Sequence, residues 1–170
     1  LSVLESGSME IQKETFDIYE MVAALAESTK ILAADKNVEF KLEGSSGILI
    51  NADEFKLEEV VTNYISNAIK HVSDNGRIEI RLIPDEDRIK LEVYNTGSAI
   101  PQEDIEHIWD KFYKVDKAHS RDYGGTGIGL SIVKAILELH DMPYGVENVD
   151  DGVIFWFEAK IQKQLKITQA

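Results

Sequence analysis

Apolar and polar positions follow two different periods along this chain of 170 residues. A period of two predicts strands with one buried face at 38–42, 48–50, 77–83, 88–94, 144–148 and 153–159. A period near 3.6 predicts helices at 17–36, 53–72 and 127–141, with a short helical stretch at 101–109. Residues 10–16 are extended in character, and 110–126 form a long polar loop. The expected fold class is therefore α+β: a two-layer α/β sandwich whose mixed, mainly antiparallel sheet is covered by helices.

Local signals set the borders of these elements. Asp17 and Asp53 can each accept a backbone N–H from the first turn of a helix. Turns around 84–87 and 150–152 predict two antiparallel hairpins. The apolar arc expected for 17–36 consists of Ile18, Met21, Val22, Leu25, Ile31 and Leu32. The arc expected for 53–72 consists of Leu57, Val60, Val61, Tyr64, Ile65 and Ala68.

Charge excludes some function classes. The formal net charge of −13 argues against a general nucleic-acid binder, which needs a basic face. The acidity can otherwise serve solubility alone. The chain has no cysteine, which excludes disulfides and thiolate metal sites, and the spacing of its histidines supports no metal site. One segment within this acidic chain is cationic and contains Lys111, Lys114, Lys117 and Arg121. It either binds phosphate or is a solvated loop.

Glycines mark the entry to the helix expected at 127–141. The segment Gly124-Gly125-Thr126-Gly127-Ile128-Gly129-Leu130 leads from the polar loop into that helix. Glycine backbone can approach a ligand closely, and free N–H groups at a helix start attract an anion such as phosphate. The spacing differs from that of a dinucleotide-binding fingerprint, and no Gly-Lys-Ser/Thr sequence of a P-loop follows. A glycine-rich turn before a helix is also common in proteins that bind no ligand.

The helix expected at 53–72 carries a polar stripe beside its apolar arc. Glu59, Asn63, Asn67 and Lys70 follow one another at three- or four-residue spacing. Asn67 lies nearest the apolar edge, so we expect it to be partly buried, and its amide oxygen suits a hard cation. Lys70 suits a phosphate. The alternative is an ordinary amphipathic helix with a solvated polar face.

Four ordered segments together resemble the ATP-binding catalytic domain of the sensor histidine kinases of bacterial two-component systems. Residues 63–71, 95–100, 109–114 and 125–130 are similar to the N, G1, F and G2 boxes of that family, over about residues 15–160. The resemblance implies a Bergerat (GHKL) ATP-binding fold, with ATP and Mg²⁺ as ligands. It implies that 1–9 close a helix of a preceding dimerisation domain and that 10–160 form the catalytic domain. The polar residues 161–170 are expected to form a frayed C-terminal tail.

The resemblance also implies residue roles. Asn67 would coordinate Mg²⁺ with Asn63 beside it, and Lys70 would complete the catalytic set. Lys70 and His71 would face the phosphate and ribose region. Asn95, Gly97 and Ile100 would belong to the adenine pocket, and Phe112 and Tyr113 would anchor a lid at 110–126. The remaining expected nucleotide contacts are Lys114, Arg121, Gly125, Thr126, Gly127, Ile128, Gly129 and Leu130.

Two positions depart from the family pattern. Asn95 stands where the family carries an Asp that accepts a hydrogen bond from the adenine amino group. Because an amide can both accept and donate, we expect weaker discrimination against guanine. Asn63 stands where related ATPases carry a Glu that acts as general base for water, and an amide is no useful base. This favours phosphoryl transfer to a protein over hydrolysis.

No acceptor for such a transfer is visible. None of the four histidines (His71, His107, His119 and His140) lies in the His-Glu/Asp-x-x-x-Pro context of the family. We therefore expect a cytoplasmic catalytic module that acts on its own separate dimerisation domain, with a response regulator as the next partner. The family likeness implies a homodimeric parent anchored in the bacterial membrane, with this chain alone monomeric. Alternatives are a nucleotide-binding regulatory module, similar to anti-sigma-factor serine kinases, and a degenerate pseudokinase.

Overall fold

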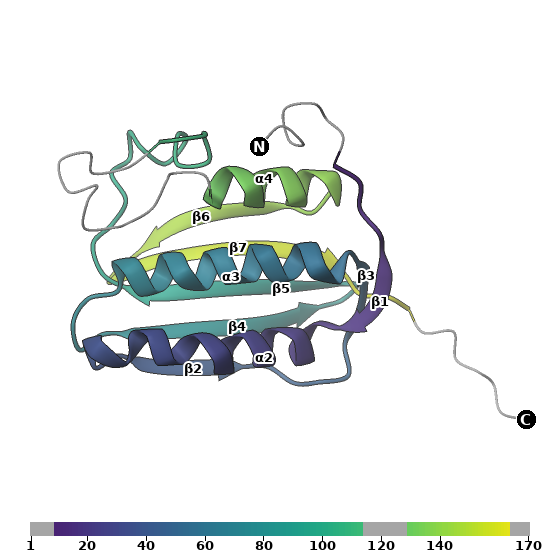
Figure 1. Ribbon diagram of the computed structural model, residues 1–170, viewed down its shortest axis with the longest axis horizontal. Coiled ribbons are helices and arrows are strands. Elements are labelled where there is room, and N and C mark those ends of the chain that lie inside the picture. The colour runs from purple at the N-terminus through teal and green to yellow at the C-terminus, as the bar shows by residue number, and fades with distance from the viewer. Residues whose placement is uncertain (1–8, 114–128, 164–170) are drawn as a thin grey trace, which may run out of the picture.

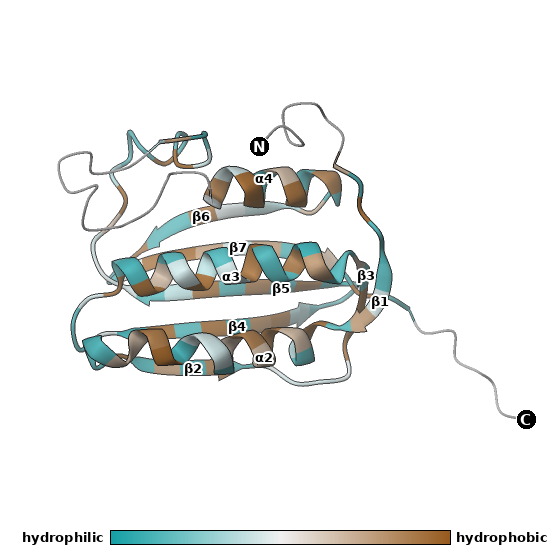
Figure 2. Cartoon of the chain, in the orientation of Figure 1, coloured by the Kyte–Doolittle hydropathy of each residue, from teal (hydrophilic) through white to brown (hydrophobic). Residues whose placement is uncertain are grey.

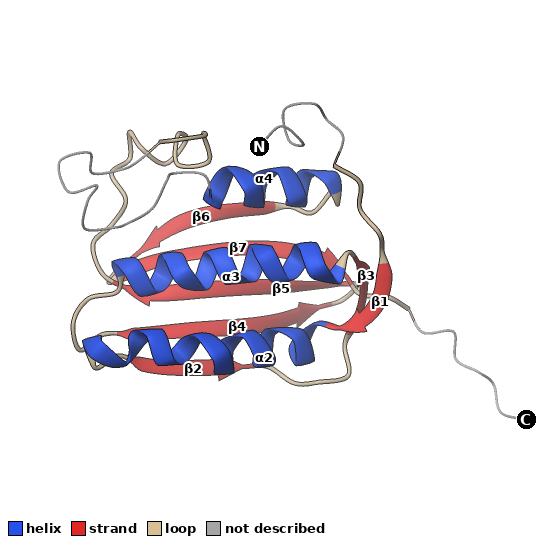
Figure 3. Cartoon of the chain, viewed as in Figure 1, coloured by secondary structure: helices blue, strands red, loops and turns tan. Residues whose placement is uncertain are grey.

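The computed structural model describes residues 9–113 and 129–163, and its helices and strands appear in Figure 3. In these ranges no helix is both long and apolar enough to cross a bilayer. The elements in chain order are β1 (Glu14–Asp17), α2 (Ile18–Thr29), the 3₁₀ helix η1 (Lys30–Lys36), β2 (Glu39–Glu43), β3 (Leu49–Ala52), α3 (Glu54–His71), β4 (Arg77–Asp85), β5 (Arg88–Thr96), α4 (Gly129–Leu139), β6 (Tyr144–Val149) and β7 (Gly152–Lys160).

Three helices cover one face of a five-stranded sheet (Figure 1). The strand order is β2-β4-β5-β7-β6, with β2 and β4 parallel and the other neighbours antiparallel. Strands β1 and β3 form a separate antiparallel pair. The predicted α+β sandwich with a mixed, mainly antiparallel sheet is confirmed, and so are both predicted hairpins, β4–β5 and β6–β7.

The core lies between the helices and the sheet because each element is apolar on the side that faces the other. On β4, Ile78 and Ile80 are fully buried, whereas the alternating residues Arg77, Glu79 and Arg81 are only half-buried. The predicted apolar arc of α3 is buried along its whole length. Figure 2 shows the same alternation as brown and teal bands on the strands and helices. The amphipathic pattern thus fixes which side of α3 is left for polar side chains.

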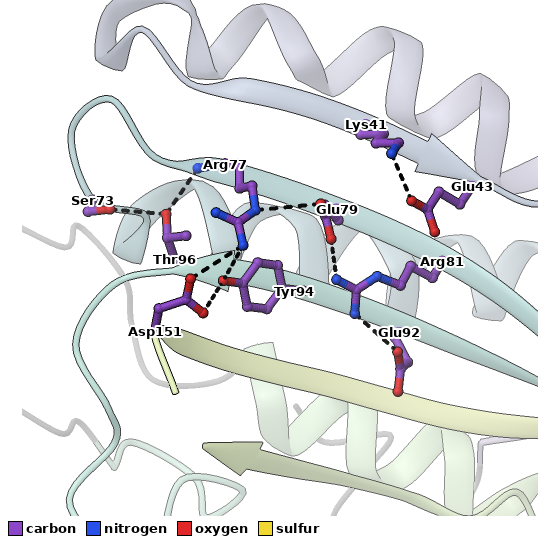
Figure 4. Close-up of polar contacts among 10 residues, drawn as sticks. All are labelled: Lys41, Glu43, Ser73, Arg77, Glu79, Arg81, Glu92, Tyr94, Thr96 and Asp151. Carbon is purple, nitrogen blue, oxygen red and sulfur yellow. Dashed lines mark hydrogen bonds and ion pairs between the residues drawn. The ribbon is translucent and has the colours of Figure 1, made fainter. Parts of the chain in front are cut away.

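The face of the sheet that points away from the helices is covered by charged side chains of the strands themselves (Figure 4). The Tyr94 ring lies between two guanidinium groups, with Arg77 Cζ at 5.3 Å and Arg81 Cζ at 5.1 Å from its centroid. Arg81 also pairs with Glu79 and Glu92. Tyr94 is consequently only 3% exposed although none of the described helices covers this face, and its pKa is raised to about 12 by burial and by its hydrogen bond to Asp151.

The helix expected over 17–36 is shorter than predicted. It begins as expected after Asp17, whose carboxylate accepts from Tyr19 N at 2.9 Å, but α2 ends at Thr29 and the chain continues as η1. Thr29 Oγ1 donates to Leu25 O at 2.6 Å, a bond that competes with the helical ladder and bends helices. The tighter winding of η1 changes which positions face inward, so Ile31 and Leu32, expected in the core, are 72% and 66% exposed.

Two further expectations are wrong. Residues 101–109 form successive turns rather than a helix, closed mainly by i to i+3 bonds such as Asp104 N to Pro101 O at 2.9 Å. The start of the supposed frayed tail is fixed, because Ile161 N donates to Asp87 O at 2.8 Å and Gln162 N to Leu49 O at 2.7 Å. The part of the tail from 164 onward lies outside the described residues.

Candidate functional site

The polar stripe of α3 lies on the side of the helix that the core leaves open. Asn63 and Asn67 are half-buried and Lys70 is exposed. Asn63 Nδ2 donates to Glu59 O at 2.8 Å, which fixes the orientation of its amide. Between the two asparagines, Tyr64 is fully buried and its hydroxyl donates to Trp156 O on β7 at 3.0 Å. The buried tyrosine therefore fixes this part of α3 against β7.

The first residue of α4 lies against this stripe. A Cβ added at Gly129 would stand 2.7 Å from Asn63 Oδ1, closer than real Cβ contacts allow. Leu130, the next residue, is half-buried and packs against the core. The end of the glycine motif and the asparagine stripe, more than sixty residues apart in sequence, thus meet side by side. A larger residue at 129 would have to displace the Asn63 amide.

The end of β5 meets the end of α3. Gly97 has a φ of +149°, and a Cβ there would stand 2.6 Å from the backbone oxygen of His71. Asn95 is 3% exposed, and its Nδ2 donates to Thr96 O at 3.1 Å. The motif around Asn95 and Gly97 is therefore in direct contact with the last turn of the asparagine helix.

A hydroxyl network fixes this junction. Thr96 Oγ1 accepts from Ser73 Oγ and from Arg77 N, both at 3.0 Å, while Ser73 N donates to Thr96 O at 3.0 Å. A Cβ at Gly76 would stand 2.1 Å from Thr96 Oγ1. The connection from α3 to β4 is thereby tied to the end of β5, which keeps the two motifs in register.

The C-terminal end of α3 collects positive charge. Lys36 Nζ donates to Ile69 O at 2.8 Å and to Lys70 O at 3.2 Å, so a side chain from η1 satisfies the last carbonyls of the helix. Desolvation, followed by the charges of Lys70 and Lys36, lowers the pKa of His71. His71 is exposed. Lys70 and Lys36 place positive charge at this end of α3, where an anion can approach.

The F-box segment is anchored differently from the expectation. Phe112, expected to hold a lid through apolar contact, is 62% exposed and has a φ of +64°. The anchors are Ile108, which is 5% exposed, and Trp109, whose ring lies edge-on to Tyr144 at 4.9 Å. Tyr113 is half-buried, and its hydroxyl donates to Asp104. The apolar residues of the turns, rather than the adjacent aromatic pair, hold this segment on the sheet.

The structure brings some of the expected site residues that it describes together in two places. Asn63 meets Gly129, and His71 meets Gly97 next to Asn95. Ile100 is half-buried and packs on the core a few residues further on. The rest of the expected set lies outside the described residues: Lys114, Arg121, Gly125, Thr126, Gly127 and Ile128.

Two polar residues that sequence reasoning passed over make long-range contacts. His140 is 6% exposed, accepts from Asp53 N at 3.0 Å and contacts Ile136 O through its other ring nitrogen at 2.8 Å. Asn148 binds the backbone of Ile100. The signal was available: His140 continues the apolar stripe of α4, and Asn148 follows Tyr144 and Val146 in the inward phase of β6. A polar residue in an apolar phase indicates a specific partner.

The chemistry of these residues fits a nucleotide with Mg²⁺. Among the described residues no group of three or more His, Cys, Asp or Glu side chains could hold a metal ion by itself. Asn67 offers one half-buried amide oxygen. Since Mg²⁺ is commonly bound by few protein ligands together with substrate phosphates and water, this donor set suits a metal that arrives with phosphates.

Comparison with known proteins identifies the family. The profile described as "Histidine kinase-, DNA gyrase B-, and HSP90-like ATPase" matches residues 52–163. Sensor protein VanSB of Enterococcus faecalis is 30% identical over 155 residues, which are 91% of this chain and 35% of that protein.

Two solved structures extend the comparison. The nucleotide-free catalytic domain of histidine kinase ThkA superposes with a TM-score of 0.78 at 27% identity, covering 88% of this chain and 96% of that one. Full-length ShkA in complex with AMPPNP gives 0.79 at 25% identity, covering 94% of this chain and 33% of that one. Because the profile spans more than half of the 170 residues, the chain belongs to the family of histidine kinase-, DNA gyrase B- and HSP90-like ATPases.

Proposed function

We propose that the chain is the catalytic domain of a sensor histidine kinase, which binds Mg-ATP and transfers its γ-phosphoryl group to a histidine of a separate dimerisation domain. The observation that carries the proposal is the contact between Gly129 and Asn63. It joins the end of the glycine motif to the asparagine helix, the two segments to which the family likeness assigns the phosphates. The histidine kinase relatives support the same reading.

The proposed site runs along α3. The base would lie at the Asn95–Ile100 end, where Gly97 lets the backbone pass close to the carbonyl of His71. The phosphates would lie along Asn63, Asn67 and Lys70 toward the start of α4. Asn67 would be the protein ligand of Mg²⁺, which, when bound, neutralises charge on the phosphate oxygens. Lys70 would add a fixed positive charge at the same end.

Transfer rather than hydrolysis follows from Asn63. Its Nδ2 donates to Glu59 O, and an amide cannot take a proton from water near neutral pH. The role left for the chain is to position the phosphates and to offset their charge while an imidazole from another domain attacks. We expect phosphate release by this chain to be slow, and rapid turnover in a phosphate-release assay would contradict the assignment.

The longer protein is also part of the proposal. The chain spans 35% of VanSB, so the activity of the longer protein would depend on segments that this chain does not contain. We propose 10–160 as the catalytic domain, 1–9 as the end of a dimerisation helix, and a response regulator as the protein that receives the phosphoryl group. The longer protein would be a membrane-anchored homodimer with this domain in the cytoplasm, and this chain alone a monomer.

Calorimetric titration with Mg-ATP tests the proposal. The unmodified chain should bind saturably, and Asn67→Asp should change both the affinity and its dependence on Mg²⁺ because a carboxylate replaces the amide oxygen. The matched control is Asn51→Asp, which adds the same charge at an exposed position before the other end of α3. This control should bind as the unmodified chain does. If the unmodified chain binds no nucleotide, the kinase assignment is wrong and a degenerate domain takes its place.

A further inference from the structure

A side-chain amide on β6 holds the backbone of the segment that follows β5. Asn148 Oδ1 accepts from Ile100 N at 2.9 Å, and Asn148 Nδ2 donates to Ile100 O at 2.9 Å. Both polar groups of one side chain therefore bind both polar groups of one distant residue. A peptide group of a neighbouring antiparallel strand offers the same donor and acceptor. The Asn148 side chain thus makes the two hydrogen bonds with Ile100 that a residue of a neighbouring antiparallel strand would make.

The position of Asn148 in β6 explains why its side chain reaches Ile100. In the β6–β7 register, Tyr144 pairs with Phe157, Val146 with Phe155 and Asn148 with Val153. Asn148 therefore shares the face of the strand that carries the inward apolar residues, although near the end of β6 it is itself exposed. An apolar residue at this position would leave Ile100 N–H and C=O without this partner.

The same hairpin holds the other end of the segment. Gly97 N donates to Asp151 O at 3.0 Å, in the turn between β6 and β7. The Asp151 carboxylate accepts from Tyr94 OH at 2.5 Å and from Arg77 Nη2 at 3.3 Å, which ties that turn to the outer face of the sheet (Figure 4).

Between these two attachments the segment has little support of its own. Ser98 and Ala99 are exposed, and Gly97 has no side chain with which to pack. The conformation of 97–100 therefore depends on the hairpin as well as on the packing of Ile100 against the core.

We infer that Asn148 is a positioning residue for the nucleotide base: it holds the backbone of 97–100 in the conformation that lines the base end of the site. This inference rests on the proposed function, which assigns the base to that segment. Without the clamp the segment must be ordered when the nucleotide binds, and that ordering lowers affinity without removing any direct contact.

The test is Asn148→Ala, titrated with ATP and with ADP. Both nucleotides carry the same base, so both dissociation constants should rise by a similar factor, roughly five- to tenfold for the loss of two hydrogen bonds outside the contact surface. Asn148→Asp keeps an acceptor for Ile100 N–H but lacks the donor to Ile100 O, so it should weaken binding as well. If Asn148→Ala does not fold, Asn148→Asp is the variant that tests the inference.

Glu147→Ala is the matched control. Glu147 is the preceding residue of β6, is exposed, and pairs with Ile154 in the outward phase of the hairpin. It should bind both nucleotides as the unmodified chain does. Amide hydrogen exchange gives a second readout, because the Ile100 N–H should exchange faster in Asn148→Ala than in Glu147→Ala.

Three results would overturn the inference. These are unchanged affinity in Asn148→Ala, a lower melting temperature with unchanged affinity, or a loss confined to ATP, which would place the defect at the phosphate end. Failure of the unmodified chain to bind either nucleotide is a different result, because it refutes the proposed function itself and the inference with it.

Discussion

Gly129 at the start of α4 and Asn63 in the middle of α3 are in such close contact that a single added carbon at Gly129 would stand 2.7 Å from Asn63 Oδ1. The contact joins two helices that are separated in sequence by the whole β4–β5 hairpin. Because Asn63 is also held by Glu59 O, its amide cannot move aside without losing a hydrogen bond. A change at Gly129 would therefore also displace the Asn63 side chain of the asparagine stripe.

Gly129→Ala should weaken nucleotide binding with little effect on stability. Alanine is a better helix former than glycine by about 1 kcal/mol, which offsets the displacement of the Asn63 side chain. Displacing that amide should raise the dissociation constant for Mg-ATP about tenfold, for one lost hydrogen bond and a misplaced group. Calorimetry and thermal melting measure the two effects separately.

A double-mutant cycle supplies the control for Gly129→Ala. In an Asn63→Ala background the added methyl group meets no Oδ1, so the second substitution should have almost no further effect on affinity. Additive losses from the two substitutions would contradict the coupling.

Trp109→Ala should destabilise the fold more than Phe112→Ala. The Trp109 ring packs edge-on against Tyr144 and lies 5.9 Å from Phe155, whereas Phe112 is 62% exposed. We expect a loss of about 2 kcal/mol for Trp109→Ala and within about 0.5 kcal/mol for Phe112→Ala. Urea denaturation measures both, and equal losses would show that Phe112 anchors the segment after all.

Asn95 should give a moderate preference for ATP over GTP. Its Nδ2 is engaged with Thr96 O, which leaves the oxygen to accept from the amino group of adenine. Guanine presents an acceptor there, so the amide would have to rotate and lose that bond, a cost equivalent to roughly a tenfold difference in affinity.

Competition binding with the two nucleotides measures this preference. Asn95→Asp, which can only accept when ionised, should increase the ratio of ATP to GTP affinity. If GTP binding is undetectable while ATP binds well, the expectation of weakened base discrimination is wrong.

Stability should fall as the pH drops below about 6.5, the ordinary pKa of histidine. Desolvation lowers the pKa of His140, and its Nε2 accepts from Asp53 N, a bond that a protonated ring cannot make. The unfolded chain therefore binds more protons than the folded chain between the lowered pKa and 6.5, so the free energy of unfolding rises with pH in that window. Above it, the contribution is fully present.

His140→Gln should reduce this pH dependence without abolishing it, because the pKa of His71 is lowered in the same direction. Urea denaturation at pH 5.5 and 7.5 provides the comparison. His107→Gln is the control, since His107 is exposed and its partner Asp110 lies in the same turn. An undiminished pH dependence in His140→Gln would contradict the assignment.

Much of this fold could be predicted from the sequence because apolar residues recur with a period of two in the strands and of about 3.6 in the helices. The apolar arc of α3 and the alternation in β4 predict burial correctly, whereas β5 departs from its alternation because Glu92 and Tyr94 are buried as well. The end of α2 at Thr29, where the hydroxyl donates to Leu25 O, could not be predicted from the apolar pattern. The pairing of β1 with β3 depends on residues more than thirty positions apart, which no local pattern specifies.

The candidate site is predictable in part. Its motifs are local in sequence, so Asn63, Asn95 and Gly129 could be singled out from the chain alone. The long-range contacts that hold these motifs in place could not be predicted. The contact of Asn148 with Ile100 spans 48 positions, and that of His140 with Asp53 spans 87. Such contacts are set by the packed sheet and helices, and the sequence marks them only as polar residues in apolar phases.

The outer face of the sheet has a consequence for how copies of this domain behave at high concentration. Its arginines and glutamates are already paired with one another across neighbouring strands, and Tyr94 is enclosed between two of them. Stacking a second sheet on this face would require those ion pairs to lose their water without gaining better partners. The net charge of −13 repels like copies as well, so stacking two copies through this face of the described strands is electrostatically unfavourable.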